Sequence, residues 1–211
     1  MVVVPILLAA AVNWADAPPV PGRCAAPAAE NAGKPGCFLT AELRIDAAPA
    51  ELWWHIFEFP STEATAPAAA GKRWAVVTGS HGRSWLHVLG GHEEQAAGAT
   101  RRARIGPLST SSEGRPITAR FIESIFTPGM RTRVHAHPGL EAFYVLDGEQ
   151  CMETPQTRGK LRAGETFIVP VGPHVQAAAK GRRNIALVLH ASDAAWMTMA
   201  PGWSPSQYCA D

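Results

Sequence analysis

The chain has 211 residues, of which 46% are hydrophobic and 18% charged, a composition typical of folded globular proteins. Nineteen Lys and Arg against 18 Asp and Glu give a net charge of +1. This balance excludes the strongly basic surface of a nucleic-acid-binding protein and gives no attraction to an anionic membrane. No apolar run reaches the roughly 18 residues that a membrane span requires. The 19 Gly and 18 Pro favour many turns and few long helices.

Residues 1–17 have the length and apolarity of a secretory signal peptide. Residues 2–12 form an apolar stretch too short to span a bilayer, and Ala15 and Ala17 form an A-x-A pattern like that of a cleavage site. No Lys or Arg precedes the stretch and Pro18 follows the pattern, so the alternative is a strand or helix of the mature fold. We expect a periplasmic or secreted protein, with a cytoplasmic location as the alternative.

Four cysteines, an even number, permit two disulfides in an exported chain. Pairing of Cys24 with Cys37 would close a short N-terminal loop, and pairing of Cys151 with Cys209 would attach the C-terminal tail to the body. The sequence leaves all three pairings open, together with four free thiols in a cytoplasmic protein. No C-x-x-C pair is present, so neither a redox motif nor a zinc ribbon is supported.

A Pro- and Ala-rich arm over residues 18–37 precedes a series of short β-type runs separated by turn residues. Their spacing is typical of an antiparallel sandwich or barrel. Residues 64–71 favour a short helix or a loop, and residues 191–211 form an extension that we expect to be ordered. The predicted strands are Phe38–Ile45, Leu52–Phe57, Trp74–Thr78, Ser84–Leu89, Thr100–Ile105, Thr118–Phe126, Thr132–His137, Ala142–Leu146, Gln150–Glu153, Gly159–Arg162, Thr166–Val169, Val175–Ala178 and Asn184–His190.

Residues 129–148 carry the most specific pattern, Gly-x5-His-x-His-x3-Glu-x6-Gly. His135 and His137 are two residues apart, so on a strand both imidazoles lie on the same face. A turn at residues 138–140 allows Glu141, at the start of the next strand, to return to the same point. Two imidazoles and a carboxylate that converge from neighbouring strands are typical ligands of a first-row transition metal.

A second run supplies a fourth candidate ligand. Gly164, Pro170 and Gly172 mark a strand and a tight turn before His174, and pairing with the first strand would bring His174 to the same metal. Three neutral imidazoles and one carboxylate suit Fe(II), Mn(II), Ni(II), Cu(II) or Zn(II), and the sequence does not choose among these divalent ions. Four ligands on an octahedral ion leave two positions for O₂, water or a bidentate substrate.

These two runs resemble the signature motifs of the cupin superfamily. Residues 129–148 match the first motif at every fixed position, whereas in the second motif His174 comes one residue early. The resemblance implies an all-β fold, a single-domain, RmlC-like cupin jelly-roll β-barrel of an uncharacterised bacterial group. Residues 115–190 would form the cupin core, residues 38–114 would add N-terminal strands to the barrel, and the C-terminal tail would be ordered.

The resemblance also implies chemistry, since cupins with this ligand set include quercetin dioxygenases, oxalate decarboxylases and oxidases. We expect a metal-dependent oxidoreductase of the dioxygenase type that acts on a small organic molecule. Glu141 would be both a ligand and the catalytic proton acceptor. Two alternatives stay open: a metal-dependent isomerase or lyase that uses no O₂, and a non-catalytic protein that binds a small molecule or a metal.

Three side chains near the motif are candidates for substrate binding. Phe143 lies two residues after Glu141 and would face the pocket, whereas Tyr144 would face away from the metal. Some cupin lyases that act on dimethylsulfoniopropionate have a Tyr at the inward position, so Phe143 disfavours that activity. Arg131 and Arg133 share the parity of the two histidines and could bind a substrate carboxylate or pair with a Glu. The alternative is two arginines at the rim that face solvent.

The expected partner is a small-molecule substrate. No nucleic-acid or membrane partner is expected, because the charge is balanced and no DNA-binding helical module is visible in the sequence. The many strands and the habit of cupins predict a homodimer formed through sheet edges.

Overall fold

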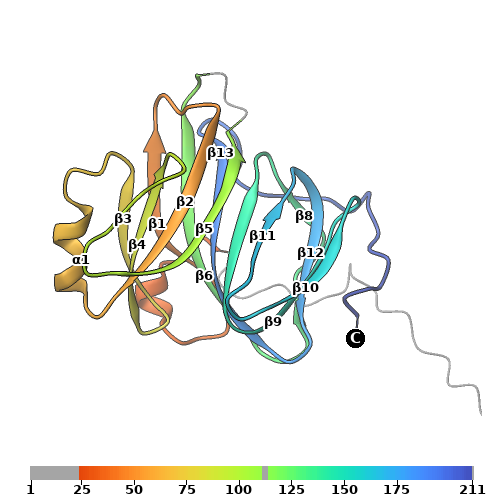
Figure 1. Ribbon diagram of the computed structural model, residues 1–211. Coiled ribbons are helices and arrows are strands. Elements are labelled where there is room, and N and C mark those ends of the chain that lie inside the picture. The colour runs from red at the N-terminus through yellow and green to blue at the C-terminus, as the bar shows by residue number, and fades with distance from the viewer. Residues whose placement is uncertain (1–23, 111–113, 211) are drawn as a thin grey trace, which may run out of the picture.

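The computed structural model describes residues 24–110 and 114–210, so the predicted signal peptide lies outside the described residues. Strands dominate this part of the chain, as the density of turn residues predicts (Figure 1). No described helix is both long and apolar enough to cross a membrane. The expectation of an all-β fold is therefore confirmed.

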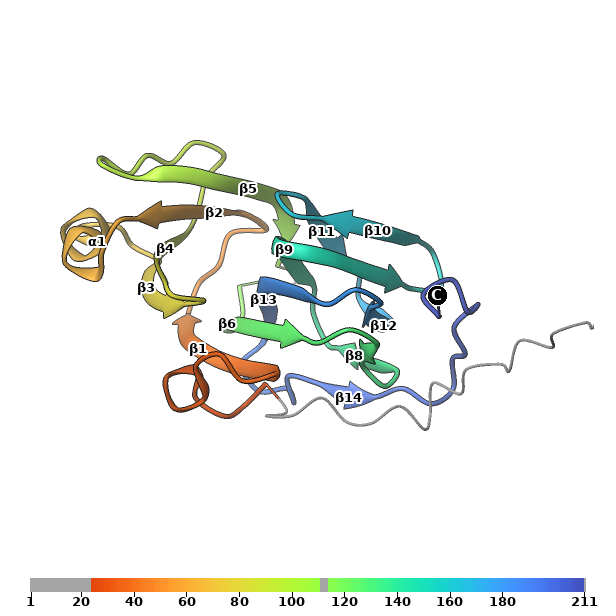
Figure 2. The ribbon, with the colours of Figure 1, turned by 90° about the horizontal axis from the view of Figure 1, so that it is seen from below.

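The larger sheet has ten strands, and its ladders are antiparallel. The sheet is curled rather than flat (Figures 1 and 2). Its main path runs β1 (Gly36–Ile45), β6 (Ile117–Phe126), β13 (Arg182–Ala191), β9 (Glu141–Glu153), β12 (Gly172–Ala178), β8 (His135–His137) and β14 (Thr198–Met199). Three shorter strands pair off this path: β7 (Met130–Arg131), β10 (Arg158–Arg162) and β11 (Thr166–Val169).

A second, four-stranded sheet is formed by the region predicted to add N-terminal strands. Its order is β3 (Ala75–Ser80), β4 (Arg83–Gly90), β2 (Glu51–Phe59) and β5 (Thr100–Ser109). The helix α1 (Thr62–Ala69) lies at its outer side (Figure 2), where Ser61 caps the first turn by accepting a hydrogen bond from the Ala64 amide. Residues 38–114 therefore divide between the sheets, since only β1 pairs with the larger one.

The strand β13 separates two apolar clusters, which explains why its sequence is apolar without alternation. Ile185, Leu187 and Leu189 pack in a cluster that also contains residues of the smaller sheet. Ala186 and Val188 belong to a second cluster on the opposite face. Because successive side chains of a strand point to opposite faces, a strand buried on both sides needs apolar residues at nearly every position.

The strand β9 runs through Gly148, whereas the sequence predicted two shorter strands, Ala142–Leu146 and Gln150–Glu153, on either side of it. Gly148 has φ +75° and pairs with Arg182, close to the point between Asp147 and Val145 where the pairing of β9 with β13 shifts register. A Cβ at this position would overlap the carbonyl oxygen of Gly181. Glycine therefore allows an irregularity and a close approach between two strands here, and β9 continues as one strand.

Two disulfides tie segments outside the strand ladders to the body. Cys24 is bonded to Cys37 at the start of β1, and Cys151 of β9 is bonded to Cys209 of the C-terminal tail. Of the three pairings open to the sequence, the structure contains this one. Two disulfides are compatible with a periplasmic or extracellular location.

Candidate metal centre

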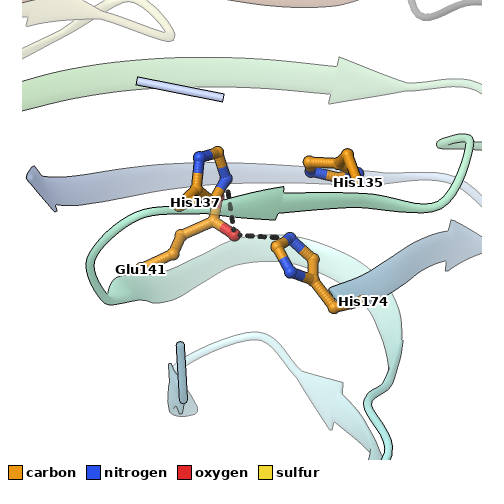
Figure 3. A group of neighbouring side chains, drawn as sticks. All are labelled: His135, His137, Glu141 and His174. Atoms are coloured by element: carbon orange, nitrogen blue, oxygen red, sulfur yellow. Dashed lines mark ion pairs between the residues drawn. The ribbon is translucent and has the colours of Figure 1, made fainter. Parts of the chain in front are cut away.

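Four side chains from three strands converge in the larger sheet (Figure 3). His135 and His137 lie on β8, Glu141 begins β9, and His174 lies on β12 directly opposite His135 in the antiparallel ladder. One potential ligand atom from each residue lies within 4.8 Å of those of the other three. The predicted group is thus assembled in space, including the histidine of the second motif.

The turn between β8 and β9 determines how the first three residues meet. His135 and His137 share a face because they are two residues apart on a strand. Gly139 in the turn lies against the backbone of Leu189, whose carbonyl oxygen a Cβ at position 139 would overlap. The absence of a side chain at Gly139 therefore allows the turn to pack closely on β13 and to return Glu141 to the two imidazoles.

Each of the three imidazoles has its Nδ1 fixed by a backbone carbonyl oxygen. A carbonyl oxygen can only accept a hydrogen bond, so Nδ1 carries the hydrogen and Nε2 of the neutral ring keeps a lone pair. Partners of this kind orient the histidine ligands of metal sites. The three bonds join His135 to Arg133 (2.8 Å), His137 to Trp196 (2.8 Å) and His174 to Gly172 (3.3 Å).

The Nε2 atoms of His137 and His174 face the Glu141 carboxylate. They lie 3.6 and 3.1 Å from its Oε2, and neither has a hydrogen-bond partner. All three side chains are buried, with exposures of 4, 1 and 5% for His137, His174 and Glu141. Two lone pairs directed at a buried carboxylate repel it unless a positive charge lies between them, either a metal ion or a proton on His137. A divalent cation supplies that charge, so the donor set fits a transition metal.

Electrostatics keep His135 and Glu141 in the protonation states that ligation requires, whereas Glu141 outweighs burial and raises the pKa of His137, so a metal would displace a proton from that ring. Burial lowers the pKa of His135 to about 3, with smaller effects from His174 and His137, so this ring is neutral at neutral pH. Burial opposes ionisation of Glu141, but the neighbouring His137 and His174 outweigh it and hold the pKa of this carboxyl below its usual range. Glu141 is therefore ionised, and His135 has a lone pair available for a metal.

A cavity of about 390 Å³ adjoins the four residues, within the usual range for small-molecule sites. His135, His137 and Glu141 contribute to its wall, and Phe143 lines it from β9. Tyr144 packs in the cluster on the opposite face of β9, as the alternation of strand residues predicts. An ion bound by the four residues would therefore have open coordination positions toward this cavity.

The two candidate arginines differ in position. Arg133 is exposed and contributes to the cavity wall. Arg131 is half-buried, and its backbone pairs with Ala177 of β12, but it does not line this cavity. The structure therefore brings Arg133 to the cavity and leaves Arg131 outside its wall.

Three cavity residues do not occupy fixed positions of the two motifs. Gln176 donates long hydrogen bonds of 3.5 and 3.4 Å to the two oxygens of Glu141. Arg182 begins β13 and lines the cavity, and Trp196 reaches it from the C-terminal tail. Gln176 could have been found from the sequence, since it lies two residues after His174 and shares its face of β12. Arg182 and Trp196 reach the cavity only through contacts between segments that are distant in the sequence.

The residues of both signature motifs thus meet on a curled antiparallel sheet beside a cavity. This arrangement confirms the predicted cupin jelly-roll architecture, with the smaller sheet packed on its outer face. The buried His-His-Glu-His group could hold a metal ion.

No protein-family model and no curated protein sequence matches the chain. Similar solved structures include a cupin superfamily protein from Desulfitobacterium hafniense, with 16% identity over 34% of this chain and 67% of that one, at a TM-score of 0.33. A cupin-like protein from Thermotoga maritima has 21% identity over 39% of this chain and 64% of that one, at a TM-score of 0.36. A DMSP lyase from Ruegeria pomeroyi has 18% identity over 39% of this chain and 43% of that one, at a TM-score of 0.35. The matched region thus covers less than half of that lyase chain.

Proposed function

We propose that this protein is a metal-dependent oxidoreductase of the dioxygenase type that acts on a small organic molecule. The observation that carries the proposal is the orientation of the three imidazoles beside a cavity: each is held through Nδ1, and the Nε2 atoms of His137 and His174 face one carboxylate. When bound there, a divalent iron, manganese, nickel or copper ion would bring a substrate and O₂ together at its open positions, whereas zinc, which has no redox chemistry, would favour the isomerase or lyase.

The chain's own residues have separate roles in this proposal. His135, His137, Glu141 and His174 hold the ion, and the partners on Nδ1 keep the rings oriented. Glu141 is ionised, the state that both a ligand and a proton acceptor require. Phe143, which is 1% exposed, gives the cavity an apolar wall against which an organic substrate can pack.

The first experiment is metal analysis of untagged protein purified without chelator, beside His135→Ala and Glu141→Gln. We expect a near-stoichiometric transition metal in the wild type and its loss in both variants. His92→Ala is the matched control, because His92 is exposed and lies outside the group. Wild-type protein that binds no metal after reconstitution would refute the metal site.

The second experiment measures O₂ uptake by the loaded protein with flavonols, catechols and oxalate. Uptake that depends on one of these compounds and disappears in Glu141→Gln supports the oxidoreductase. A fully loaded protein that turns a substrate over without O₂ contradicts the dioxygenase and supports the isomerase or lyase. A loaded protein that turns over none of the panel would favour a non-catalytic binding protein.

A further inference from the structure

A buried guanidinium forms part of the cavity wall beside the four candidate ligands. Arg182 begins β13, is 3% exposed and lines the same cavity as Glu141 and Phe143. Burial lowers the pKa of Arg182 to about 9, with a smaller opposing effect from Glu141, so the side chain stays charged at neutral pH. The cavity therefore contains a cation that is largely shielded from water.

The hydrogen bonds of Arg182 satisfy only part of its donor set. Nη1 donates to the hydroxyl and the backbone carbonyl of Ser124, and Nη2 donates to Oε1 of Gln176 at 3.0 Å. The buried Nε has no partner. The guanidinium also lies over the ring of Phe126, with its carbon 3.7 Å from the ring centroid. The Nε–H donor is thus unused, and Nη2 has a second hydrogen besides the one that it donates to Gln176.

The charge of Arg182 also lacks a direct counter-ion. No carboxylate in the described part of the chain lies within ion-pair distance of its guanidinium, and Gln176 stands between it and Glu141. Glu141 is already shared by two imidazoles, and a metal would use its remaining charge. A buried, unpaired charge is costly, so an anion that enters the cavity would gain a strong electrostatic partner.

We propose that Arg182 is the anion-binding residue of this cavity and that the substrate is a small organic acid with an apolar body. Its carboxylate accepts hydrogen bonds from Nε and Nη2 of Arg182, in the paired geometry that guanidinium groups favour. Its apolar body packs on Phe143, and its reacting end lies toward the four candidate ligands. This inference rests on the proposed function and names the substrate class of that site.

Arg182 suits this role better than the arginines of the first motif. Arg133 lines the cavity but is exposed, so water screens its charge, and Arg131 does not line the cavity. Arg182 is desolvated. At a desolvated site an ionic hydrogen bond contributes more to discrimination between an acid and its neutral analogue than it does at an exposed site.

The test is calorimetric titration of the metal-loaded protein with benzoate and with the neutral analogue benzamide. The variants are Arg182→Met, which keeps the length and apolar stem of the side chain, and Arg183→Met. Arg183 is the matched control because it is the next residue of β13 and is exposed. We expect Arg182→Met to weaken benzoate binding by about 10- to 100-fold, the loss typical of an ionic hydrogen bond. Benzamide binding should be equal in all three proteins.

Two further measurements separate this proposal from its alternatives. Metal content is determined for each protein, so failure of the metal site is seen independently of benzoate binding. Arg182→Lys keeps the charge without the paired geometry and should recover part of the benzoate affinity. If Arg182→Met keeps its metal and binds benzoate as tightly as the wild type, the proposal is overturned while the metal site stands. Equal loss of benzoate and benzamide binding would show a purely structural role and would also overturn it.

Discussion

His137 donates the hydrogen on its Nδ1 to the backbone carbonyl oxygen of Trp196, across 2.8 Å. The two rings also stack, with centroids 5.5 Å apart. Trp196 belongs to the C-terminal tail, 59 residues after His137, and the disulfide between Cys151 and Cys209 holds the end of that tail to β9. The orientation of one candidate ligand therefore depends on a segment beyond the last long strand.

Release of the tail should weaken metal binding. In the double variant Cys151→Ser/Cys209→Ser the tail loses its covalent anchor, and His137 loses part of the restraint from Trp196. We expect metal affinity to fall by about 10- to 100-fold, as for loss of other partners that orient a ligand. Competition with a chromophoric chelator measures it. The control is Cys24→Ser/Cys37→Ser, which removes the disulfide of the N-terminal loop. Equal affinity in the two double variants would contradict the prediction.

Gly139→Ala should damage both stability and metal binding. The added Cβ would overlap the carbonyl oxygen of Leu189, so either the turn or β13 must move. We expect a loss of about 1–3 kcal/mol in the free energy of unfolding, as for other overpacked sites. Metal affinity should also fall because the turn positions Glu141 against His137.

Denaturant unfolding and chelator competition check both effects of Gly139→Ala. Gly159→Ala is the matched control, because a Cβ at Gly159 meets no atom within 4 Å and its φ is not positive. That variant should stay within about 0.5 kcal/mol of the wild type. Gly139→Ala protein with wild-type stability and wild-type metal affinity would show that the turn has room to relax.

His87 should make the protein less stable in mild acid. It is a buried residue of β4 whose ring lies 4.9 Å from that of Phe121 in the larger sheet. Its Nδ1 accepts a hydrogen bond from Trp54 Nε1 at 3.2 Å, and its Nε2 lies 3.0 Å from the Thr78 hydroxyl oxygen. Burial lowers the pKa of His87 from 6.5 to about 3. Between these values the unfolded chain binds a proton that the folded chain does not. The contribution of neutral His87 to the free energy of unfolding is complete above pH 6.5 and is lost as the pH falls toward 3.

The measurement is urea unfolding at a series of pH values from neutral to about pH 4. We expect the free energy of unfolding to fall as the pH falls, by up to about 1.4 kcal/mol per pH unit from this group. His87→Gln should reduce that slope, since an amide does not titrate in this range. His92→Gln is the control, because His92 is exposed. An unchanged slope in His87→Gln would show that His87 does not titrate on unfolding.

The free sheet edges predict self-association. In the described residues, β3 ends the smaller sheet and pairs with β4 on one side only. An edge strand presents unpaired amide and carbonyl groups that a second copy can pair with. We expect light scattering to give twice the mass of the chain, and a monomeric mass at micromolar concentration would refute the homodimer.

The sequence by itself determined the local part of the site. The spacing of His135, His137 and Glu141 follows from the two-residue repeat of a strand and one short turn, so it could be predicted without knowing the fold. The position of Phe143 beside the cavity and of Tyr144 away from it follows from the same repeat. Each of these relations spans fewer than about ten residues, a range over which the local backbone geometry decides the side of the sheet to which each side chain points.

Only the tertiary structure decided the rest. Arg182 and Trp196 reach the cavity because β13 pairs with β9 and β6 and because the tail returns to β8, contacts that no local spacing encodes. The division of residues 38–114 between two sheets likewise depends on which strand edges meet. Such pairing is selected by the burial of whole sheet faces rather than by the sequence of one segment. An arginine that becomes buried and an arginine at the cavity rim therefore cannot be distinguished in the sequence before the strand pairing is known.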